Sequence, residues 1–222
     1  MDNDLKVCVF FDVDHTLVKG STGSLYIKYL YKRKLITLSK VLQALFWNLQ
    51  YKFNLLNRNK FSHRILKWLE GTPEKDTRQI NREFVYDKLK SYLYADALNT
   101  IDSHRNRGHE IVLFSAESNY MIEPIGELIK VDKFICTELE VKNGVFLGCF
   151  KEPFCYGEGK LQKLYDYANN QNLDLKNCYV YSDSIVDLSS LEAVGNPVVV
   201  NPDRFLKKEA KKRKWKTAYF NQ

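Results

Sequence analysis

The chain has 222 residues, of which 45% are hydrophobic and 27% charged, and its formal net charge is +7. This is typical of a soluble globular protein with one large domain, or with a core and a small insert. Five scattered cysteines without a CxxC pair argue against a disulfide framework or a zinc site. No apolar run approaches the ~20 residues that span a bilayer, and the N-terminus lacks a signal-peptide pattern. We therefore expect a cytoplasmic protein.

The charge is spread unevenly along the chain. Residues 19–95 contain 16 Lys/Arg and 5 Asp/Glu, and residues 204–216 contain 8 and 1. The rest of the chain is net acidic. Such an asymmetry indicates parts with different roles.

Short apolar runs and helical patterns alternate over much of the chain. The alternation predicts an α/β fold with a doubly wound parallel sheet and right-handed crossovers. The expected strands are 7–11, 110–116, 178–183 and 197–200, and the expected helices are 96–107, 120–130 and 160–171.

Residues 19–95 interrupt this alternation because they contain no convincing strand. They show helical patterns near 24–34, 38–56, 60–69 and 75–94. We expect a helical insert at 19–95 after the first strand, with 1–18 and 96–222 forming the core. Residues 137–150, with Asn143-Gly144 as their turn, predict a β-hairpin.

Two aspartates, Asp12 and Asp14, directly follow the first predicted strand. Ligands of open α/β sheets bind beyond the carboxyl ends of the strands. A buried carboxylate pair is costly without a cation or a chemical task. In two-step phosphate transfer one carboxylate attacks phosphorus and the other exchanges protons. By itself the pair is better explained as a polar turn whose side chains cap the local backbone, because short motifs often match by chance.

Polar groups also follow the other predicted strands. Ser115 and Ala116 end the second, where a hydroxyl and main-chain N–H groups suit phosphate. Lys160 opens a helix after Gly-Glu-Gly. Asp183 and Asp187 follow a later strand, and their carboxylates suit Mg²⁺. Each feature has a plain structural alternative, such as a cap or a surface charge. Together they supply a nucleophile, an acid, a phosphate clamp and metal ligands.

The segments FFDVDHTL, LFSAES, GEGKLQKL and YSDSIVDL resemble the four motifs of the haloacid dehalogenase superfamily. The chain is similar to its subfamily IB, the phosphoserine-phosphatase-like branch, which has a helical cap after the first motif on a Rossmann-like core. The resemblance covers most of 110–216, whereas 19–95 matches only in position and helical character.

This resemblance implies a phosphoric monoester hydrolase that works through an aspartyl-phosphate. Asp12 would be the nucleophile and Asp14 the acid and base, with Ser115, Ala116 and Lys160 binding phosphate. Mg²⁺ would be held by the carboxylates of Asp12 and Asp183 and by the carbonyl of Asp14, with Asp187 supporting that shell.

The chain departs from the branch in two places. Phosphoserine phosphatases carry a glutamate shortly after the first motif that meets the substrate amino group, and residues 18–23 contain no acid. The fourth motif reads SDSIVD instead of a glycine-rich GDGxND. The expected substrate is therefore a small phosphorylated metabolite, with phosphoserine-like compounds among the candidates.

Other functions fit parts of the pattern. A phosphotransferase or phosphomutase would use the same intermediate on Asp12, and phosphate release without an added acceptor distinguishes them. A non-catalytic module that binds anionic lipid or nucleic acid is the alternative outside enzymes. His63, His104 and His109 lack mutual metal-ligand spacing, so we expect them at surface or capping positions.

The basic segment 19–95 bears on substrate choice because caps of this superfamily cover the site. Arg64 and Lys67 are its candidates for substrate contact. Residues 41–56 are largely apolar and suit packing on the core, on another subunit or, peripherally, on a membrane. The tail 204–216 predicts a charged helix, and no nucleic-acid-binding motif accompanies it. The sequence leaves the oligomeric state open.

Overall fold

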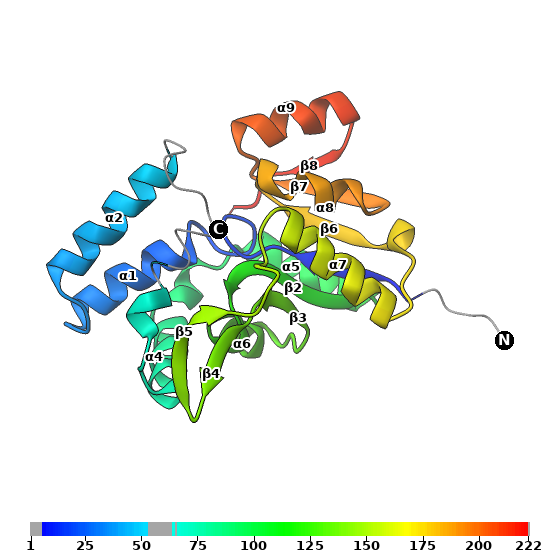
Figure 1. The fold of residues 1–222 in the computed structure, drawn as a ribbon. Helices are drawn as coiled ribbons and strands as arrows, with labels where there is room; N and C mark the ends of the chain where they lie inside the picture. The colour runs from blue at the N-terminus through cyan, green and yellow to red at the C-terminus, as the bar shows by residue number, and fades with distance from the viewer. Residues whose placement is uncertain (1–5, 53–63, 65, 222) are drawn as a thin grey trace.

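Figure 1 shows the computed structural model, which describes residues 6–52, 64 and 66–221. A six-stranded sheet with the order β3-β2-β1-β6-β7-β8 forms its centre, and every neighbouring pair is parallel. The strands are β1 (Cys8–Phe11), β2 (Glu110–Ser118), β3 (Phe134–Thr137), β6 (Tyr179–Ser182), β7 (Asn196–Val200) and β8 (Lys216–Ala218). The predicted doubly wound α/β fold is confirmed.

The helices lie between and beside these strands. They are α1 (Thr22–Lys32), α2 (Leu38–Lys52), α4 (Glu74–Asp87), α5 (Ala95–Arg105), α6 (Asn119–Ile129), α7 (Glu158–Asn170), α8 (Leu188–Glu192) and α9 (Arg204–Arg213). Short 3-10 turns occur at Lys67–Leu69, Leu89–Tyr92, Leu175–Asn177 and Ile185–Asp187. The predicted hairpin is formed by β4 (Leu139–Lys142) and β5 (Val145–Phe150). Within the described ranges, no helix has both the length and the apolar character to cross a membrane.

Successive residues of β1 face opposite sides of the sheet and so build two cores. Val9 and Phe11 pack in a cluster that includes Ile101 of α5 and Ile122 of α6. Cys8 and Phe10 pack in a second cluster. That cluster takes Leu164 from α7, Leu191 from α8 and Leu206 from α9. Because both faces are covered, β1 is apolar at every position, and this continuous run made it predictable.

Two strands of the sheet were not predicted. β8 is only three residues long, and its Lys216 and Thr217 at the sheet edge are exposed, so it lacks the apolar run that marks a buried strand. β3 is as long as β1 and β6 and is apolar, but it directly precedes the predicted hairpin. The charged tail helix is present as α9 but ends at Arg213, because Lys214 takes a left-handed conformation that turns the chain into β8.

The ends of the predicted insert meet beside the sheet. Val18 and Leu93 pair as an isolated antiparallel bridge. Lys19 N–H donates to the Tyr92 carbonyl at 2.7 Å, and Tyr94 N–H donates to the Leu17 carbonyl at 3.0 Å. The expected helices at 24–34 and 75–94 correspond to α1 and to α4 with its following 3-10 turn. Residues 53–56 and most of the expected helix 60–69 lie outside the described residues.

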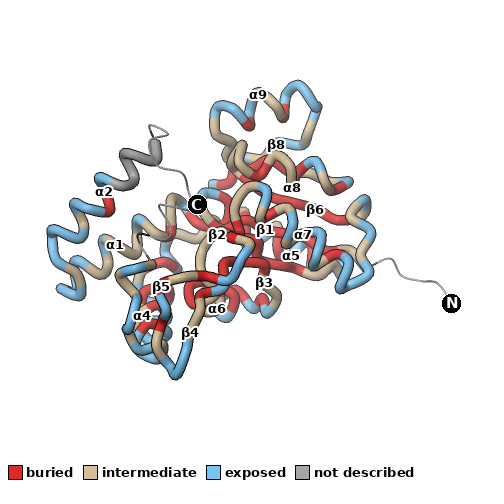
Figure 2. Tube along the Cα trace, in the orientation of Figure 1, coloured by how far each residue is buried: buried red, intermediate tan, exposed pale blue. Residues whose placement is uncertain are grey.

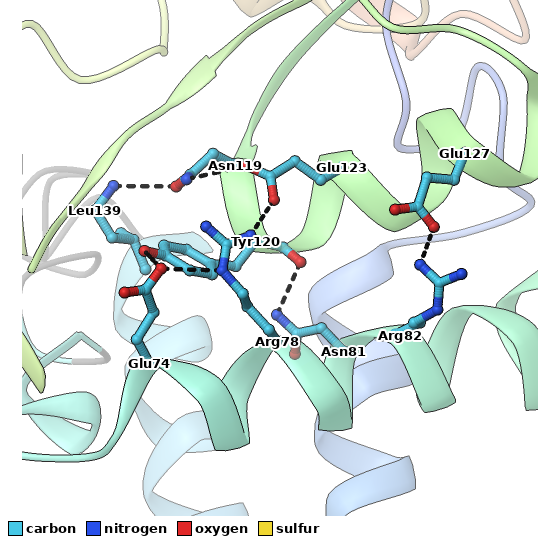
Figure 3. A network of polar contacts seen from close by, with 9 residues as sticks. All are labelled: Glu74, Arg78, Asn81, Arg82, Asn119, Tyr120, Glu123, Glu127 and Leu139. Atoms are coloured by element: carbon cyan, nitrogen blue, oxygen red, sulfur yellow. Dashed lines mark hydrogen bonds and ion pairs between the residues drawn. The ribbon is translucent and has the colours of Figure 1, made fainter. Parts of the chain in front are cut away.

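A network of polar contacts joins α4 to α6 of the core (Figure 3). Buried Asn81 donates from Nδ2 to the Tyr120 carbonyl at 3.2 Å. The other contacts are two ion pairs, Arg78–Glu123 and Arg82–Glu127, and a 2.9 Å hydrogen bond from the Tyr120 hydroxyl to Glu74. The second half of the insert is thereby held on the core.

Candidate active site

Asp12 lies at the carboxyl end of β1, between two other strand ends. Phe11 is level with Leu113 of β2 and Tyr181 of β6. The Asp12 N–H donates to the Tyr181 carbonyl at 3.0 Å, which extends the pairing by one residue. Asp12 is only 8% exposed. A buried carboxylate is therefore fixed at the edge of the sheet where ligands of such folds bind.

Lys160 is the counter-charge of this carboxylate. Its Nζ donates to Asp12 Oδ1 at 2.8 Å and to Asp187 Oδ2 at 2.6 Å. The same Asp187 oxygen accepts a 2.7 Å hydrogen bond from the Ser182 hydroxyl. Lys160 is 3% exposed, so these contacts are shielded from water. The structure thus brings together three of the residues predicted for the site: Asp12, Lys160 and Asp187.

Two glycines place Lys160 in the first turn of α7. Gly157 has φ 53° and ψ −124°, a combination that only glycine adopts readily. A Cβ on Gly159 would stand 2.2 Å from the Phe154 carbonyl oxygen, so the chain can pass there only without a side chain. The local backbone therefore requires both glycines of the GEGK segment, and this backbone directs Lys160 at Asp12.

Asp12 and Asp183, at neighbouring strand ends, have raised pKa values. Burial raises the pKa of Asp12 to about 7, against the opposing effect of Lys160, and the charges of Asp187 and Asp14 add to the rise. Burial, followed by the charges of Asp12 and Asp187, raises the pKa of Asp183 to about 8. Burial alone would lower the pKa of Lys160, but the two adjacent carboxylates hold it above its ordinary value. Three carboxylates thus share one lysine.

This excess of negative charge suits a divalent cation. Repulsion between Asp12 and Asp183 is relieved when a hard cation takes oxygen ligands from both. Among the described residues, no three His, Cys, Asp or Glu side chains form a group that could hold a metal ion. The expected donor set is different, since it combines two side-chain carboxylates, Asp12 and Asp183, with the main-chain carbonyl of Asp14. The residues present fit Mg²⁺ by their charge and chemistry.

Asp14 is tied to the start of the insert. Its Oδ1 accepts a 2.9 Å hydrogen bond from the N–H of Thr22, the first residue of α1. Thr22 is fully buried, and its hydroxyl has no hydrogen-bond partner among the described residues. Thr22 could not be selected from the sequence, because its contact with Asp14 depends on the turn that brings α1 back to the first motif.

Ser115 and Ala116 lie at the end of β2, beside β1. Ser115 is 2% exposed, and its hydroxyl oxygen accepts a hydrogen bond from Glu117 N–H at 3.2 Å. The Ala116 carbonyl accepts from the Thr137 hydroxyl at 2.8 Å. Both contacts stabilise the turn and leave the Ser115 hydroxyl proton to be donated to a ligand.

The segment after β6 is held by Asp203, which the sequence did not single out. The Asp183 carbonyl accepts a hydrogen bond from Asp203 N–H at 2.8 Å, and an Asp203 carboxylate oxygen accepts from Ile185 N–H at 2.7 Å. Asp203 also caps α9. Asp183 and Asp187 do not share a helix face as their spacing allowed, because Asp183 precedes the 3-10 turn that Asp187 ends.

Glu117 supplies a carboxylate to the stretch that lacks one. Its Oε1 lies 3.4 Å from the position that a Cβ would take on Gly23 in α1. Its charge also contributes, after burial and Tyr29, to the raised pKa of Tyr26 in the same helix. Residues 18–23 contain no acid, but the fold brings one there from the end of β2. Glu117 within the LFSAES segment was the feature of the sequence that could have indicated this carboxylate.

The remaining sequence expectations have mixed outcomes. His104 is buried, and its Nε2 forms a 2.8 Å hydrogen bond with the Tyr181 hydroxyl, so the expectation of a surface or capping position for it was wrong. Lys67 is exposed and pairs with Glu70 at 3.2 Å, and Arg64 is also exposed. The expected substrate contacts of Arg64 and Lys67 stay predictions. His63 lies outside the described residues.

Relatives with functional names match nearly the whole chain. A probable phosphatase of Mycobacterium tuberculosis is 30% identical over 98% of this chain and 76% of its own length. A phosphoserine phosphatase of the same organism is 28% identical over 98% and 72%. A histidinol-phosphatase of Neisseria meningitidis is 27% identical over 97% of this chain and all of its own length.

Solved structures share the fold. A Bordetella pertussis protein described as of unknown function has a TM-score of 0.88 at 23% identity, with 96% of this chain and 97% of that chain covered. An aspartyl-phosphate analogue complex of phosphoserine phosphatase has a TM-score of 0.67 at 18% identity, with 93% and 91% covered. The model of haloacid dehalogenase-like hydrolases matches residues 9–192. The chain therefore belongs to the haloacid dehalogenase-like hydrolase family and is a phosphoric monoester hydrolase.

Proposed function

We propose that the chain is a magnesium-dependent phosphatase that forms an aspartyl-phosphate on Asp12 and acts on a small phosphomonoester. The observation that carries this proposal is the buried contact of Lys160 with Asp12 and Asp187 at the end of β1. Such an arrangement holds a carboxylate nucleophile beside a fixed positive charge, and phosphate transfer depends on positioning and charge neutralisation.

The reaction proceeds in two steps at the carboxyl edge of the sheet. In the first, the Asp12 carboxylate attacks phosphorus while Asp14 donates a proton to the departing alcohol oxygen. In the second, Asp14 takes a proton from water, whose oxygen attacks phosphorus and releases phosphate from Asp12. The Ser115 hydroxyl and the Lys160 ammonium hold the phosphoryl oxygens. The carboxylates of Asp12 and Asp183 and the Asp14 carbonyl would hold Mg²⁺, which would supply further charge neutralisation.

We further propose that residues 19–95 act as a cap over this site, on a core of 1–18 and 96–222. The meeting of the two connections at Val18 and Leu93 supports this division. The hydrogen bond from Thr22 to Asp14 links the first turn of the cap to the general acid. An insert joined at one place beside the acid is well positioned to contact the leaving group.

The leaving group that fits best is a small alcohol with a positively charged amine. Glu117 places a carboxylate against Gly23 at the start of α1, on the same element that contacts Asp14. A carboxylate there favours a cationic group through charge pairing. Serine and histidinol, the alcohols in the names of two relatives, both carry an amino group.

The proposal is tested by phosphate release from a panel of phosphomonoesters with Mg²⁺, including phosphoserine, histidinol phosphate, sugar phosphates and nucleotides. Wild type is compared with Asp12→Asn and with Asp166→Asn, an exposed aspartate of α7. We expect turnover to fall by more than about 10³-fold in Asp12→Asn and to stay unchanged in Asp166→Asn. Near-normal activity in that variant contradicts the mechanism, and release only with an added alcohol acceptor favours a phosphotransferase.

A further inference from the structure

One side of α2 is apolar and exposed. Leu38, Leu42, Leu45 and Phe46, here called the α2 face, follow helical spacing and lie on one side of the helix. Their exposed fractions lie between 53% and 61%. Ala44, on the opposite side of the helix, is 4% exposed. Figure 2 shows this part of α2 as a tube mostly in the colour of exposed residues, which stands away from the sheet. The helix therefore turns its larger apolar side chains away from the protein.

Exposed apolar residues are concentrated in this one place. Ten large hydrophobic residues of the described chain are exposed, and six of them fall between residues 31 and 46. The two beyond the α2 face are Tyr31 in α1 and Leu35 in the connection between the helices. Single exposed apolar residues are ordinary, whereas a contiguous group marks a contact surface.

The segment that carries this surface is basic and contains no acid. Residues 15–69 contain 11 Lys/Arg and no Asp or Glu. Lys32, Lys34 and Lys40 are exposed near the α1–α2 connection. Of the nearby cations, Arg33 is paired with Glu83 at 2.9 Å, but Lys32 and Lys34 have no carboxylate of the described residues within ion-pair distance. The apolar surface is thus bordered by uncompensated positive charge.

We propose that the α2 face docks on the surface of an anionic lipid bilayer. Leucine and phenylalanine side chains of such a helix enter the boundary between headgroups and acyl chains, while flanking lysines pair with lipid phosphates. Nucleic acid would use the lysines but not the large aliphatic side chains. The proposal concerns where the protein works and stands apart from the chemistry at Asp12.

The test is sedimentation of the full chain with vesicles of phosphatidylcholine, with and without phosphatidylglycerol. Wild type is expected to sediment with the phosphatidylglycerol vesicles, and less so at high salt, because salt screens lysine–phosphate attraction. A triple variant, Leu42→Ser, Leu45→Ser and Phe46→Ser, is expected to bind these vesicles at least about tenfold more weakly than wild type. Lys32→Gln with Lys34→Gln is expected to weaken binding to anionic vesicles in particular.

Lys208→Gln with Lys211→Gln is the matched control, since it removes two exposed charges from α9 instead. Unchanged melting temperature and unchanged hydrolysis of a soluble phosphomonoester establish that the α2 variants are folded. If the triple variant has a lowered melting temperature, the proposal is judged by whether the Lys32 and Lys34 double variant binds anionic vesicles more weakly than wild type. Three results overturn the proposal: wild type that stays in solution, binding lost equally in the α9 control, or a wild-type dimer that the triple variant makes monomeric.

Discussion

Lys160 Nζ lies 2.8 Å from Asp12 Oδ1, although the two residues are 148 positions apart in the sequence. The contact joins the start of α7 to the end of β1 and is closed to water. Because the lysine also holds Asp187, it serves both the stability of the sheet edge and the proposed chemistry. These two roles are separable by experiment.

Lys160→Met tests both roles. The change leaves two buried carboxylates without their cation, and breaking a buried ion pair from one side costs about 3–5 kcal/mol. We expect the free energy of unfolding in urea to fall by this amount at pH 7.5, together with loss of phosphatase activity. Lys176→Met, at an exposed lysine, should change neither. A Lys160→Met protein as stable as wild type would show that Asp12 and Asp187 do not depend on this charge.

Mg²⁺ should stabilise the protein in the absence of substrate. Asp12 and Asp183 repel each other at the strand ends, and a bound cation relieves this. At a concentration 100 times its dissociation constant a ligand adds about 2.7 kcal/mol, so the melting temperature should rise with MgCl₂ more than with NaCl of equal ionic strength.

Asp183→Asn should remove that Mg²⁺ response. It should also raise the melting temperature of the metal-free protein, because one of the repelling charges is gone. Equal responses to Mg²⁺ in wild type and Asp183→Asn would place the ion elsewhere. The measurement does not depend on turnover and so separates metal binding from catalysis.

Glu117→Gln tests the proposed selection of a cationic leaving group. Loss of the charge should raise KM about tenfold or more for substrates with an amino group, the size expected for a charge-assisted contact. Hydrolysis of p-nitrophenyl phosphate, whose leaving group carries no amine, should change little. An equal loss on both substrates would mean that Glu117 supports the turn after Ser115 and does not select the substrate.

His104 predicts a pH dependence of stability. Burial, followed by the charges of Arg107 and His109, lowers its pKa to about 4. A histidine whose folded pKa is below its unfolded value near 6.5 stabilises the fold above that value and loses the effect as pH falls toward 4. Its Nδ1 lies 2.9 Å from His109 Nδ1, a hydrogen bond that requires one unprotonated nitrogen.

His104→Gln should therefore flatten the stability profile between pH 6.5 and 4. The variant keeps a polar side chain but cannot titrate, and it should lose about 3 kcal/mol less free energy of unfolding than wild type across this window. Urea unfolding at several pH values measures it. Parallel profiles for wild type and His104→Gln would assign the acid sensitivity to other groups, among them His109, whose pKa is also lowered by burial.

The sequence predicted the central sheet because β1, β2, β6 and β7 are continuous apolar runs, and it predicted the site because chemical groups follow those runs. It missed β8, which has no apolar run, and β3, a short apolar segment directly before the predicted hairpin. It also missed the contributions of Thr22 and Glu117, which depend on how α1 returns to the strand ends. Spacing in the chain carries no information on such contacts between distant segments.

An aspartyl-phosphate on Asp12 can be detected by peptide mass spectrometry. The enzyme is quenched in acid during turnover, treated with borohydride, which reduces an aspartyl-phosphate to homoserine, and digested with trypsin. Lys6 and Lys19 bound the peptide 7–19, which carries both Asp12 and Asp14. We expect homoserine at position 12 only, and none without substrate. Homoserine at position 14, or rapid phosphate release with an unmodified peptide, would contradict it.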